Sequence, residues 1–313
     1  ERVRRDSLAT LRKMGIEPYP AAEFAATHRS NALAESFEDG KEVTLAGRLM
    51  NRRIMGKASF AVLQDSEGTA QLYLNRDEMC PGDDKSMYND VFKKLLDRGD
   101  FIGIQGTTFT TKTGEQSVKV KTLTVLSKSL KPLPSVKVDE DGNVHDAFTD
   151  PELRYRMRYV DLVVNPDVKK TFEARSQIIR TIRESFDQQG WLEVDTPVLQ
   201  TIPGGAAARP FITHHNALDS TLYLRIANEL YLKRLIVGGF EGVFEFSRNF
   251  RNEGMDRTHN PEFTVLELYV AYKDYRCMME TTEQLLANIC QAVHGGTKAN
   301  LNGVDIDFAP PYK

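Results

Sequence analysis

Alternation of apolar and polar residues is the dominant pattern in the first third of the chain. Val43, Leu45 and Leu49 fall on one side of an extended segment, because successive side chains of a strand point to opposite faces. Similar runs predict five strands in all, over 43–49, 60–63, 70–74, 101–109 and 118–126. Turn residues at 66–68 and 112–115 indicate two hairpins, and apolar spacing predicts a helix over 88–97 between the third and fourth strands.

Helical spacing opens the chain. Leu8, Leu11 and Met14 recur at intervals of three residues, which predicts a short amphipathic helix within residues 1–20. Gly15 and the prolines behind it are stop signals for that helix.

The second half begins after a stretch of different composition. Residues 131–150 are rich in Pro, Asp and Gly and poor in apolar residues, which predicts a linker. A long helix is expected over 167–189, followed by a strand over 191–194. Apolar residues alternate with polar ones over 262–269, which predicts another strand.

The order of three strands, a helix and two strands is that of an OB barrel. We therefore expect an α+β chain in which a five-stranded OB β-barrel precedes part of a second domain. The expected domains are a helical extension at 1–40, the barrel at 41–130, the linker at 131–150 and the second domain at 151–313.

Composition adds limits rather than a function. At 313 residues, with 41% hydrophobic and 27% charged residues, the chain suits a globular protein of about two domains. We find no apolar run of membrane-spanning length and no signal peptide. Three scattered cysteines and a net charge of −3 predict neither a disulfide framework nor a strongly basic nucleic-acid binder. We therefore expect a cytoplasmic protein without a membrane partner.

The most informative stretch is F-R-N-E-G-M-D-R-T-H-N-P-E-F-T-V-L-E-L-Y, residues 250–269. It combines Arg251, Arg257 and His259 with three glutamates and interleaved apolar residues. A solvated hairpin laced with ion pairs is the plain interpretation of such charges. The wording, however, resembles the second signature motif of class II aminoacyl-tRNA synthetases. Within that class the closing E-L-Y is most similar to the lysyl-tRNA synthetases of subclass IIb.

The resemblance implies amino-acid activation, in which a carboxylate joins the α-phosphate of ATP. Two anions must then be held together, and the planar fork of an arginine suits that task. The residues implied at ATP are Arg251, which is also the catalytic residue, Glu253, His259 and Phe263. The residues implied at lysine, whose two ammonium groups need counter-charges, are Gly205, Glu229, Arg251, Glu267 and Tyr269. Asn228 stands where this family commonly has proline, a change from which we expect little effect.

The barrel carries basic residues without acidic ones from Val43 to Gln64, namely Arg48, Arg52, Arg53 and Lys57, followed by Phe60. Basic groups attract phosphates and an aromatic face accepts a stacked base, although Phe60 could equally be barrel core. The resemblance to the anticodon-binding barrel of lysyl-tRNA synthetases implies that Phe60 stacks on the central anticodon base. It further implies that Arg53 and Gln71 bond that base and that Glu115 contacts a neighbouring one, in tRNA-Lys.

Further expectations come from the resemblance alone. The helix at 167–189 and the segment 191–197 resemble the first class II motif, which implies a homodimer with Pro197 at its interface. The third motif is absent, so we expect a truncated piece of a longer synthetase, with the Mg²⁺ ligands in the missing part. No metal site is expected in the residues present, because His214 and His215 are adjacent on a strand and point to opposite faces.

Two alternatives stay open beside a lysine–tRNA ligase. An aspartyl- or asparaginyl-type relative would share both domains but would need basic groups at the substrate side chain. A non-catalytic, synthetase-like RNA-binding protein would agree with the missing motif and disagree with the intact arginine motif.

Overall fold

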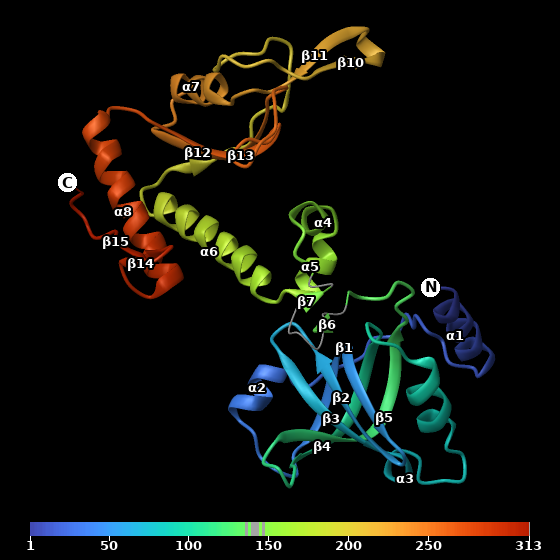
Figure 1. The fold of residues 1–313 in the computed structure, drawn as a ribbon. Helices are drawn as coiled ribbons and strands as arrows, with labels where there is room; N and C mark the ends of the chain where they lie inside the picture. The colour runs from blue at the N-terminus through green and yellow to red at the C-terminus, as the bar shows by residue number, and fades with distance from the viewer. Residues whose placement is uncertain (135–136, 139–143, 146–147, 313) are drawn as a thin grey trace. The chain divides into compact units, whose positions relative to one another are not determined.

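The computed structural model describes residues 1–134, 137–138, 144–145 and 148–312 (Figure 1). These residues form two compact units, Glu1–Val164 and Asn165–Lys313. Parts of the predicted linker, at 135–136, 139–143 and 146–147, lie outside the described residues. Its described part holds two short paired strands, β6 (Lys137–Val138) and β7 (Val144–His145).

Five strands of the first unit close into a barrel in the order β1–β2–β3–β5–β4 (Figure 1). Their bounds are β1 (Glu42–Met55), β2 (Ala58–Gln64), β3 (Thr69–Asn75), β4 (Phe101–Thr110) and β5 (Gln116–Ser127). All neighbouring strands are antiparallel except β3 and β5, which run parallel. All five predicted strands therefore exist, and the OB arrangement is confirmed.

The barrel interior follows the predicted alternation. Val43, Leu45 and Leu49 of β1 are buried with inward residues of the other four strands. The predicted helix between the third and fourth strands is η1 (Met87–Leu95), wound as a π-helix, and it adds the buried Val91 and Phe92. The other helices of this unit are α1 (Arg2–Lys13), α2 (Ser30–Glu35), α3 (Arg76–Met79), α4 (Pro151–Arg156) and α5 (Arg158–Val164).

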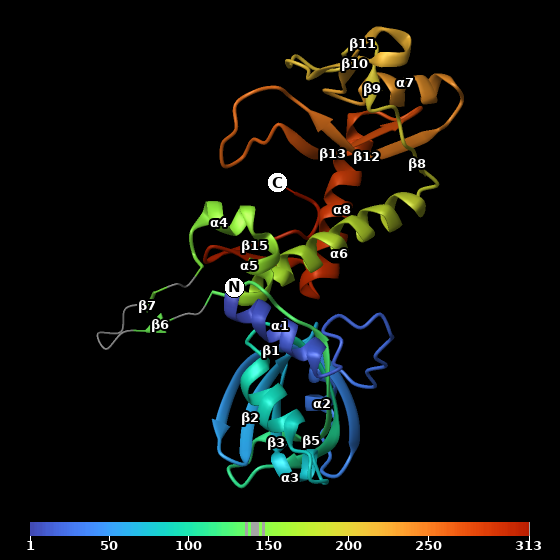
Figure 2. The same ribbon diagram turned by 90° about the vertical axis from the view of Figure 1, so that its right-hand side faces the viewer.

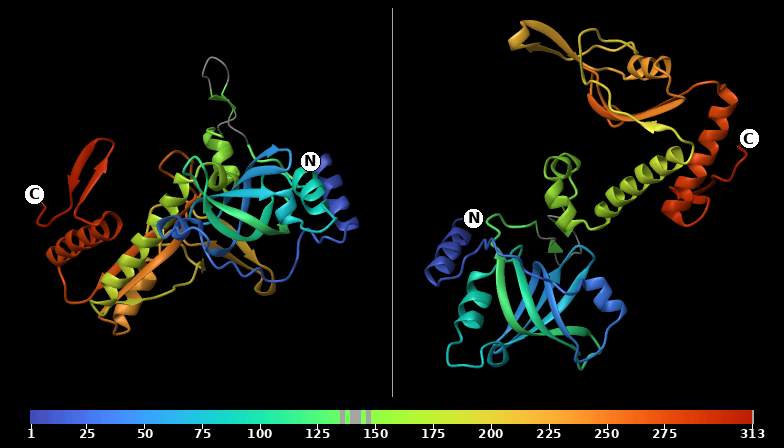
Figure 3. Two further views of the ribbon diagram at one scale, coloured as in Figure 1. Left: turned by 90° about the horizontal axis from the view of Figure 1, so that it is seen from below. Right: turned by 180° about the vertical axis from the view of Figure 1, so that it is seen from behind.

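Helix α1 is attached to the barrel beside η1, as Figures 2 and 3 show. Leu11 is fully buried in the barrel core. The prediction for Met14 is wrong: the helix ends at Lys13, and Met14 is 38% exposed. Gly15, the predicted stop signal, follows the C-cap Met14 with a positive φ of 78°, as glycines at helix ends commonly do.

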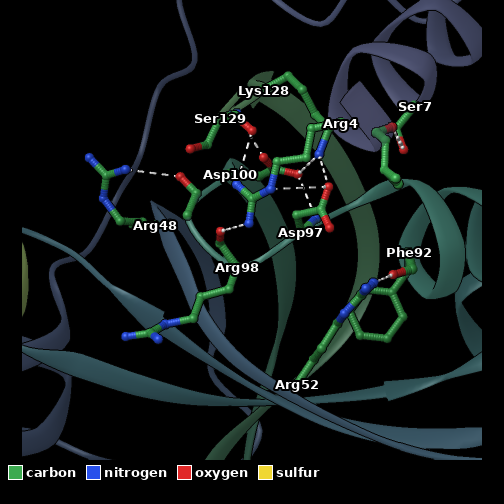
Figure 4. A network of polar contacts seen from close by, with 12 residues as sticks. Arg4, Ser7, Arg48, Arg52, Phe92, Asp97, Arg98, Asp100, Lys128 and Ser129 are labelled. Atoms are coloured by element: carbon green, nitrogen blue, oxygen red, sulfur yellow. Dashed lines mark hydrogen bonds and ion pairs between the residues drawn. The ribbon is translucent and has the colours of Figure 1, made fainter. Parts of the chain in front are cut away.

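A buried ion pair lies in the barrel unit near the point where α1 is attached (Figure 4). Lys128 Nζ lies 2.8 Å from Asp100 Oδ2 and 2.5 Å from Asp97 Oδ2. Asp100 also accepts hydrogen bonds from the backbone N–H groups of Asp97 and Ser129, each at 2.7 Å. Burial raises the pKa of Asp100, and the bond from Lys128 opposes that rise. Arg4 of α1 donates to the carbonyl oxygens of Arg98 and Ser129, so α1 is tied to this cluster.

The second unit contains a sheet in the order β13–β12–β8 and another in the order β10–β11–β9, with the hairpin β14–β15 near its end. Its helices are α6 (Asp167–Asp187), α7 (Glu229–Val237) and α8 (Tyr275–His294), with a short 3₁₀ turn η2 (Asn216–Leu218). Its strands are β8 (Leu192–Glu193), β9 (Leu199–Gln200), β10 (Ile212–His215), β11 (Ser220–Leu224), β12 (Gly242–Phe250), β13 (Glu262–Val270), β14 (Lys298–Leu301) and β15 (Val304–Asp307).

Successive residues of β12 point to opposite faces of the sheet. Phe244 and Phe246 face a core that includes Ile182 and Phe186 of α6, together with Leu285 and other residues of α8. The phenyl rings of Phe186 and Phe244 meet edge to face with their centroids 4.9 Å apart. Because α6 and α8 fill this face, the opposite face of the β12–β13 hairpin is the one on which a site can form.

Candidate functional site

The open face of the hairpin carries the residues that alternate with that core. Glu245 stands directly opposite Glu267 in the β12–β13 register, Val243 opposite Tyr269, and Asn249 opposite Phe263. Side chains of directly opposed residues in an antiparallel pair project from the same face. Glu267, Tyr269 and Phe263, three of the residues selected from the sequence, therefore share one face of one strand.

Carboxylates gather at one end of this face. Tyr269 donates its hydroxyl hydrogen bond to Glu267 Oε2 at 3.2 Å. Burial raises the pKa of Glu267, and the nearby carboxylates of Glu229 and Glu245 raise it further. Burial, together with Glu267 and Glu229, also raises the pKa of Tyr269. Glu229, at the first position of α7, thus lies within electrostatic reach of Glu267. This end of the face favours a bound cation, because a positive charge reduces the repulsion between carboxylates that are held close together.

At the same end of the face, the backbone of Gly205 passes close to the start of α7. Gly205 adopts a φ of 87°, and a Cβ atom placed on it would lie 3.1 Å from Ala227 Cβ and 3.2 Å from Glu229 Cβ. A larger residue would therefore be strained in its backbone and would press on the glutamate. The segment around Gly205 is thus fixed against the start of α7, as the small-residue loop predicted from the sequence requires.

The other end of the face is cationic and aromatic. Arg251 follows β12, and its guanidinium carbon lies 5.1 Å from the centroid of the Phe263 ring. Its Nε atom is buried, and no described protein group accepts its hydrogen. A buried donor without a partner is costly, so this atom is available to an anionic ligand. Burial has the largest effect on the pKa of Glu267 and raises it, whereas the Arg251 cation acts to lower it, so Arg251 lies within electrostatic reach of the carboxylates.

The connection from 251 to 261 holds the remaining predicted nucleotide residues. Glu253 and His259 are both exposed. The imidazole of His259 is held by Asp256, whose carboxylate oxygens lie 2.9 and 2.8 Å from Nδ1. The structure thus places Arg251, Glu253, His259 and Phe263 on one hairpin.

A buried polar network lies beneath the carboxylates. Glu245 is 2% exposed and accepts hydrogen bonds from Arg225 Nη1 at 2.8 Å, Thr196 Oγ1 at 2.7 Å and Asn228 Nδ2 at 2.8 Å. Arg225 also donates to the carbonyl oxygen of Arg248 at 2.8 Å. Since Asn228 caps α7, the network fixes the start of that helix, and with it Glu229, to β12. A proline at position 228 would lack this amide donor.

The barrel presents a second candidate site on its outer surface. Phe60 alternates with the buried Ser59 and Ala61, so it projects outward and is not barrel core. Arg53 stands opposite Phe60 in the β1–β2 register and is exposed. Gln71 faces outward from β3, where its Nε2 donates to Ser117 Oγ at 2.9 Å, and Glu115 is exposed in the β4–β5 turn.

Phe60 belongs to a row of three rings. Its centroid lies 5.3 Å from that of Tyr73 on β3, which lies 5.6 Å from that of Phe109 on β4. The basic residues are less available than the sequence suggested. Arg48 donates to the Gly99 carbonyl at 2.9 Å and covers the Phe101 ring, and Arg52 donates to the Phe92 carbonyl. Arg53 and Lys57 are the exposed pair of the four.

Comparison with known proteins agrees with this geometry. Residues 150–313 match the family described as tRNA synthetases class II (D, K and N), which is more than half of the chain. The chain belongs to that class II tRNA synthetase family. Residues 43–126 of the synthetase chain match the OB-fold nucleic acid binding domain.

Three curated relatives of the synthetase chain are lysine–tRNA ligases. That of Christiangramia forsetii is 62% identical over 313 residues, which are all of this chain and 55% of that protein. That of Porphyromonas gingivalis is 61% identical, again over the whole chain and 55% of the relative. That of Azobacteroides pseudotrichonymphae is 58% identical over 99% of this chain and 62% of the relative. The chain therefore spans little more than half the length of these relatives.

Several site residues of the synthetase chain escaped the sequence analysis. Glu245 could have been suspected, because it is a charged residue between two phenylalanines of a strand. Lys233 could have been suspected from its i,i+4 spacing to Glu229, to which its Nζ pairs at 2.5 Å. Arg225 and Thr196 gave no such signal, since only the fold brings them to Glu245.

Two further findings concern the chain as a whole. No helix among the described residues has both the length and the apolar character needed to cross a bilayer. The family match begins at residue 150, whereas α4 and α5 group with the first compact unit. The domain bounds given above therefore remain a prediction.

Proposed function

We propose that the full-length protein containing this chain is a lysine–tRNA ligase. It would form lysyl-adenylate from lysine and ATP and then transfer lysine to tRNA-Lys. The observation that carries the proposal is the polarity of one sheet face, with the carboxylates Glu229 and Glu267 at one end and a buried, unpartnered donor atom of Arg251 at the other. The lysine–tRNA ligase names of the relatives support the same substrate.

Each group has a physical task in this proposal. Glu229 and Glu267, with Tyr269, offer counter-charge and hydrogen bonds to the ammonium groups of lysine, and Gly205 leaves room above them. Arg251 holds the lysine carboxylate and the α-phosphate of ATP together, and it stabilises the negative charge that accumulates as they join. Phe263 provides an apolar surface for adenine, and Glu253 and His259 border the nucleotide.

The residues present fit ATP better than they fit its metal. The free Arg251 donor beside the Phe263 ring suits a phosphate next to an aromatic base. Across the described ranges, no three His, Cys, Asp or Glu side chains gather as metal ligands would. We propose Mg²⁺ as the companion of ATP.

Amino-acid specificity provides the direct test of the proposal. Lysine, and neither aspartate nor asparagine, is expected to drive ATP–pyrophosphate exchange by the full-length protein, because carboxylates at the pocket repel an acidic side chain. Exchange driven by aspartate alone would overturn the substrate assignment. An absence of exchange with every amino acid, together with intact tRNA binding, would favour the non-catalytic alternative.

We propose that the barrel binds the anticodon of tRNA-Lys through Phe60, Arg53, Gln71 and Glu115. Phe60→Ala is expected to weaken tRNA binding by roughly 1–3 kcal/mol, because stacking of a base on the ring is lost. Fluorescence anisotropy with a tRNA transcript at fixed salt would measure it. Phe101→Ala removes another surface phenyl ring, which is 38% exposed on β4 beneath Arg48, and it should leave the affinity unchanged. Equal effects of the two variants would contradict the stacking role.

A homodimer and a cytoplasmic location complete the proposal. Pro197 is exposed, and the segment around it exposes several large apolar side chains: Leu192, Val198, Leu199 and Ile202. Apolar patches of this kind commonly mark protein interfaces. Sedimentation that showed only monomers of the full-length protein would refute the dimer. Cys80, Cys277 and Cys290 are free thiols, which agrees with a reducing compartment.

A further inference from the structure

The β12–β13 connection contains a compact arrangement around Asp256. Asp256 Oδ1 accepts hydrogen bonds from the backbone N–H groups of Thr258 at 2.7 Å and His259 at 2.8 Å, and from Thr258 Oγ1 at 3.1 Å. The Asp256 N–H in turn donates to the His259 carbonyl oxygen at 3.1 Å. Asp256 Oδ2 is left for one partner, His259 Nδ1, at 2.8 Å. Oδ1 also lies 2.9 Å from His259 Nδ1. Oδ1 therefore shapes the backbone, and both oxygens of the carboxylate face the imidazole.

The chemistry of these partners decides the protonation of the ring. The backbone N–H of Thr258, followed by the His259 side chain, holds the pKa of Asp256 far below its ordinary value, so the group is a carboxylate. A carboxylate only accepts hydrogen bonds, so Nδ1 must carry the hydrogen between them. Nε2 is then left on the outer side of a ring that is 74% exposed. The hydrogen bonds of this imidazole within the described chain involve Nδ1 alone.

We propose that Asp256 is a positioning residue for His259, which it holds with Nδ1 protonated so that Nε2 is directed at a phosphate of the bound nucleotide. This inference rests on the proposed function, which places His259 at ATP. To donate to a phosphate oxygen, Nε2 must itself gain a proton, which the ring takes from solvent. The resulting imidazolium lies between two anions, the Asp256 carboxylate and the phosphate, and both stabilise it.

A plainer explanation is that Asp256 only shapes the loop. Asp256→Asn separates the two roles, because the carboxamide oxygen can keep the backbone bonds while its NH₂ replaces Oδ2. That NH₂ donates to Nδ1, so the ring hydrogen is expected on Nε2, and a neutral amide takes the place of the carboxylate that stabilises the imidazolium. The loop is then preserved, and the charge that faces the phosphate is lost.

The expected result for Asp256→Asn in the full-length protein is an approximately tenfold higher KM for ATP in pyrophosphate exchange, with the KM for lysine unchanged. A charge-assisted bond replaced by a neutral one loses about that factor. Asp84→Asn is the matched control. Asp84 is another exposed aspartate that accepts a backbone bond, from Ser86 N at 2.8 Å, and it lies in the barrel unit. The control should leave both KM values unchanged.

Nitrogen NMR of the labelled protein adds a readout that a purely structural role would not change. Wild-type His259 should show Nδ1 protonated, with conversion to the imidazolium signature on saturation with ATP. Asp256→Asn should show Nε2 protonated and no conversion. An unprotonated Nδ1 in the wild type, no response to ATP, or a normal KM for ATP in Asp256→Asn would each overturn the inference. If the wild type responds to ATP but lysine drives no exchange, the ligase proposal fails and the role of Asp256 stands.

Discussion

Arg251→Ala is expected to lower lysine-dependent ATP–pyrophosphate exchange by the full-length protein at least about a hundredfold. Removal of a single donor that stabilises transition-state charge commonly costs a factor of about 10²–10³, and this side chain is proposed to serve two anions at once. Affinity for tRNA should stay nearly intact, because the proposed anticodon contacts are on the barrel. Exchange kinetics and tRNA anisotropy on the same preparation would measure both effects.

Arg248→Ala is the matched control for that experiment. Arg248 is on β12, three residues before Arg251, its side chain is 58% exposed, and it pairs with Glu262 at 3.6 Å. Its backbone carbonyl, which accepts the hydrogen bond from Arg225, remains in the variant. Normal exchange by Arg251→Ala, or an equal loss in Arg248→Ala, would rule out a specific role of the Arg251 guanidinium.

Lys128→Met is expected to destabilise the barrel unit by about 3–5 kcal/mol, because it leaves the carboxylate of Asp100 buried without its cation. Asp100 is 0% and Lys128 2% exposed, so water cannot replace the lost partner. Native-state hydrogen exchange of the β4 and β5 amides would measure this stability separately from the second unit.

Two further variants make the interpretation specific. Lys121→Met breaks the exposed pair with Glu42, whose atoms are 2.8 Å apart, and should cost less than about 1 kcal/mol. Asp100→Asn combined with Lys128→Met removes both buried charges and should recover a large part of the loss. A loss in Lys128→Met no greater than in Lys121→Met would show that the buried pair does not stabilise the barrel.

The sequence predicted most of the barrel because its signal is local. Apolar residues recur at every second position along much of each barrel strand, and turn residues separate the strands, so neither feature depends on distant parts of the chain. Met14 shows where apolar periodicity fails to predict the end of a helix. It continues the apolar spacing of α1, but the helix ends before it, and nothing in the periodicity marks that end.

In the candidate site, too, the local features could be predicted from the sequence and the long-range contacts could not. The positions of Phe263, Glu267 and Tyr269 on one face follow from their even spacing along a strand. The contact of Gly205 with Glu229, and the convergence of Arg225, Thr196 and Asn228 on Glu245, join distant segments of sequence, so no local pattern could reveal them. The inward bonds of Arg48 and Arg52 were likewise hidden, because a basic composition does not show which side chains are already bonded to backbone carbonyls.

The two ends of the β12–β13 face differ in how they are built. The network on Glu245 joins the start of α7 to β12 through buried bonds, so the carboxylates above it belong to one rigid piece. The stretch from 251 to 261 is held by hydrogen bonds among its own residues and by one bond from the Asn252 N–H to the Arg209 carbonyl. An amine that binds at the carboxylates would therefore meet a preformed pocket. A polyphosphate that binds beside the 251–261 stretch would meet a segment that can change its conformation on binding.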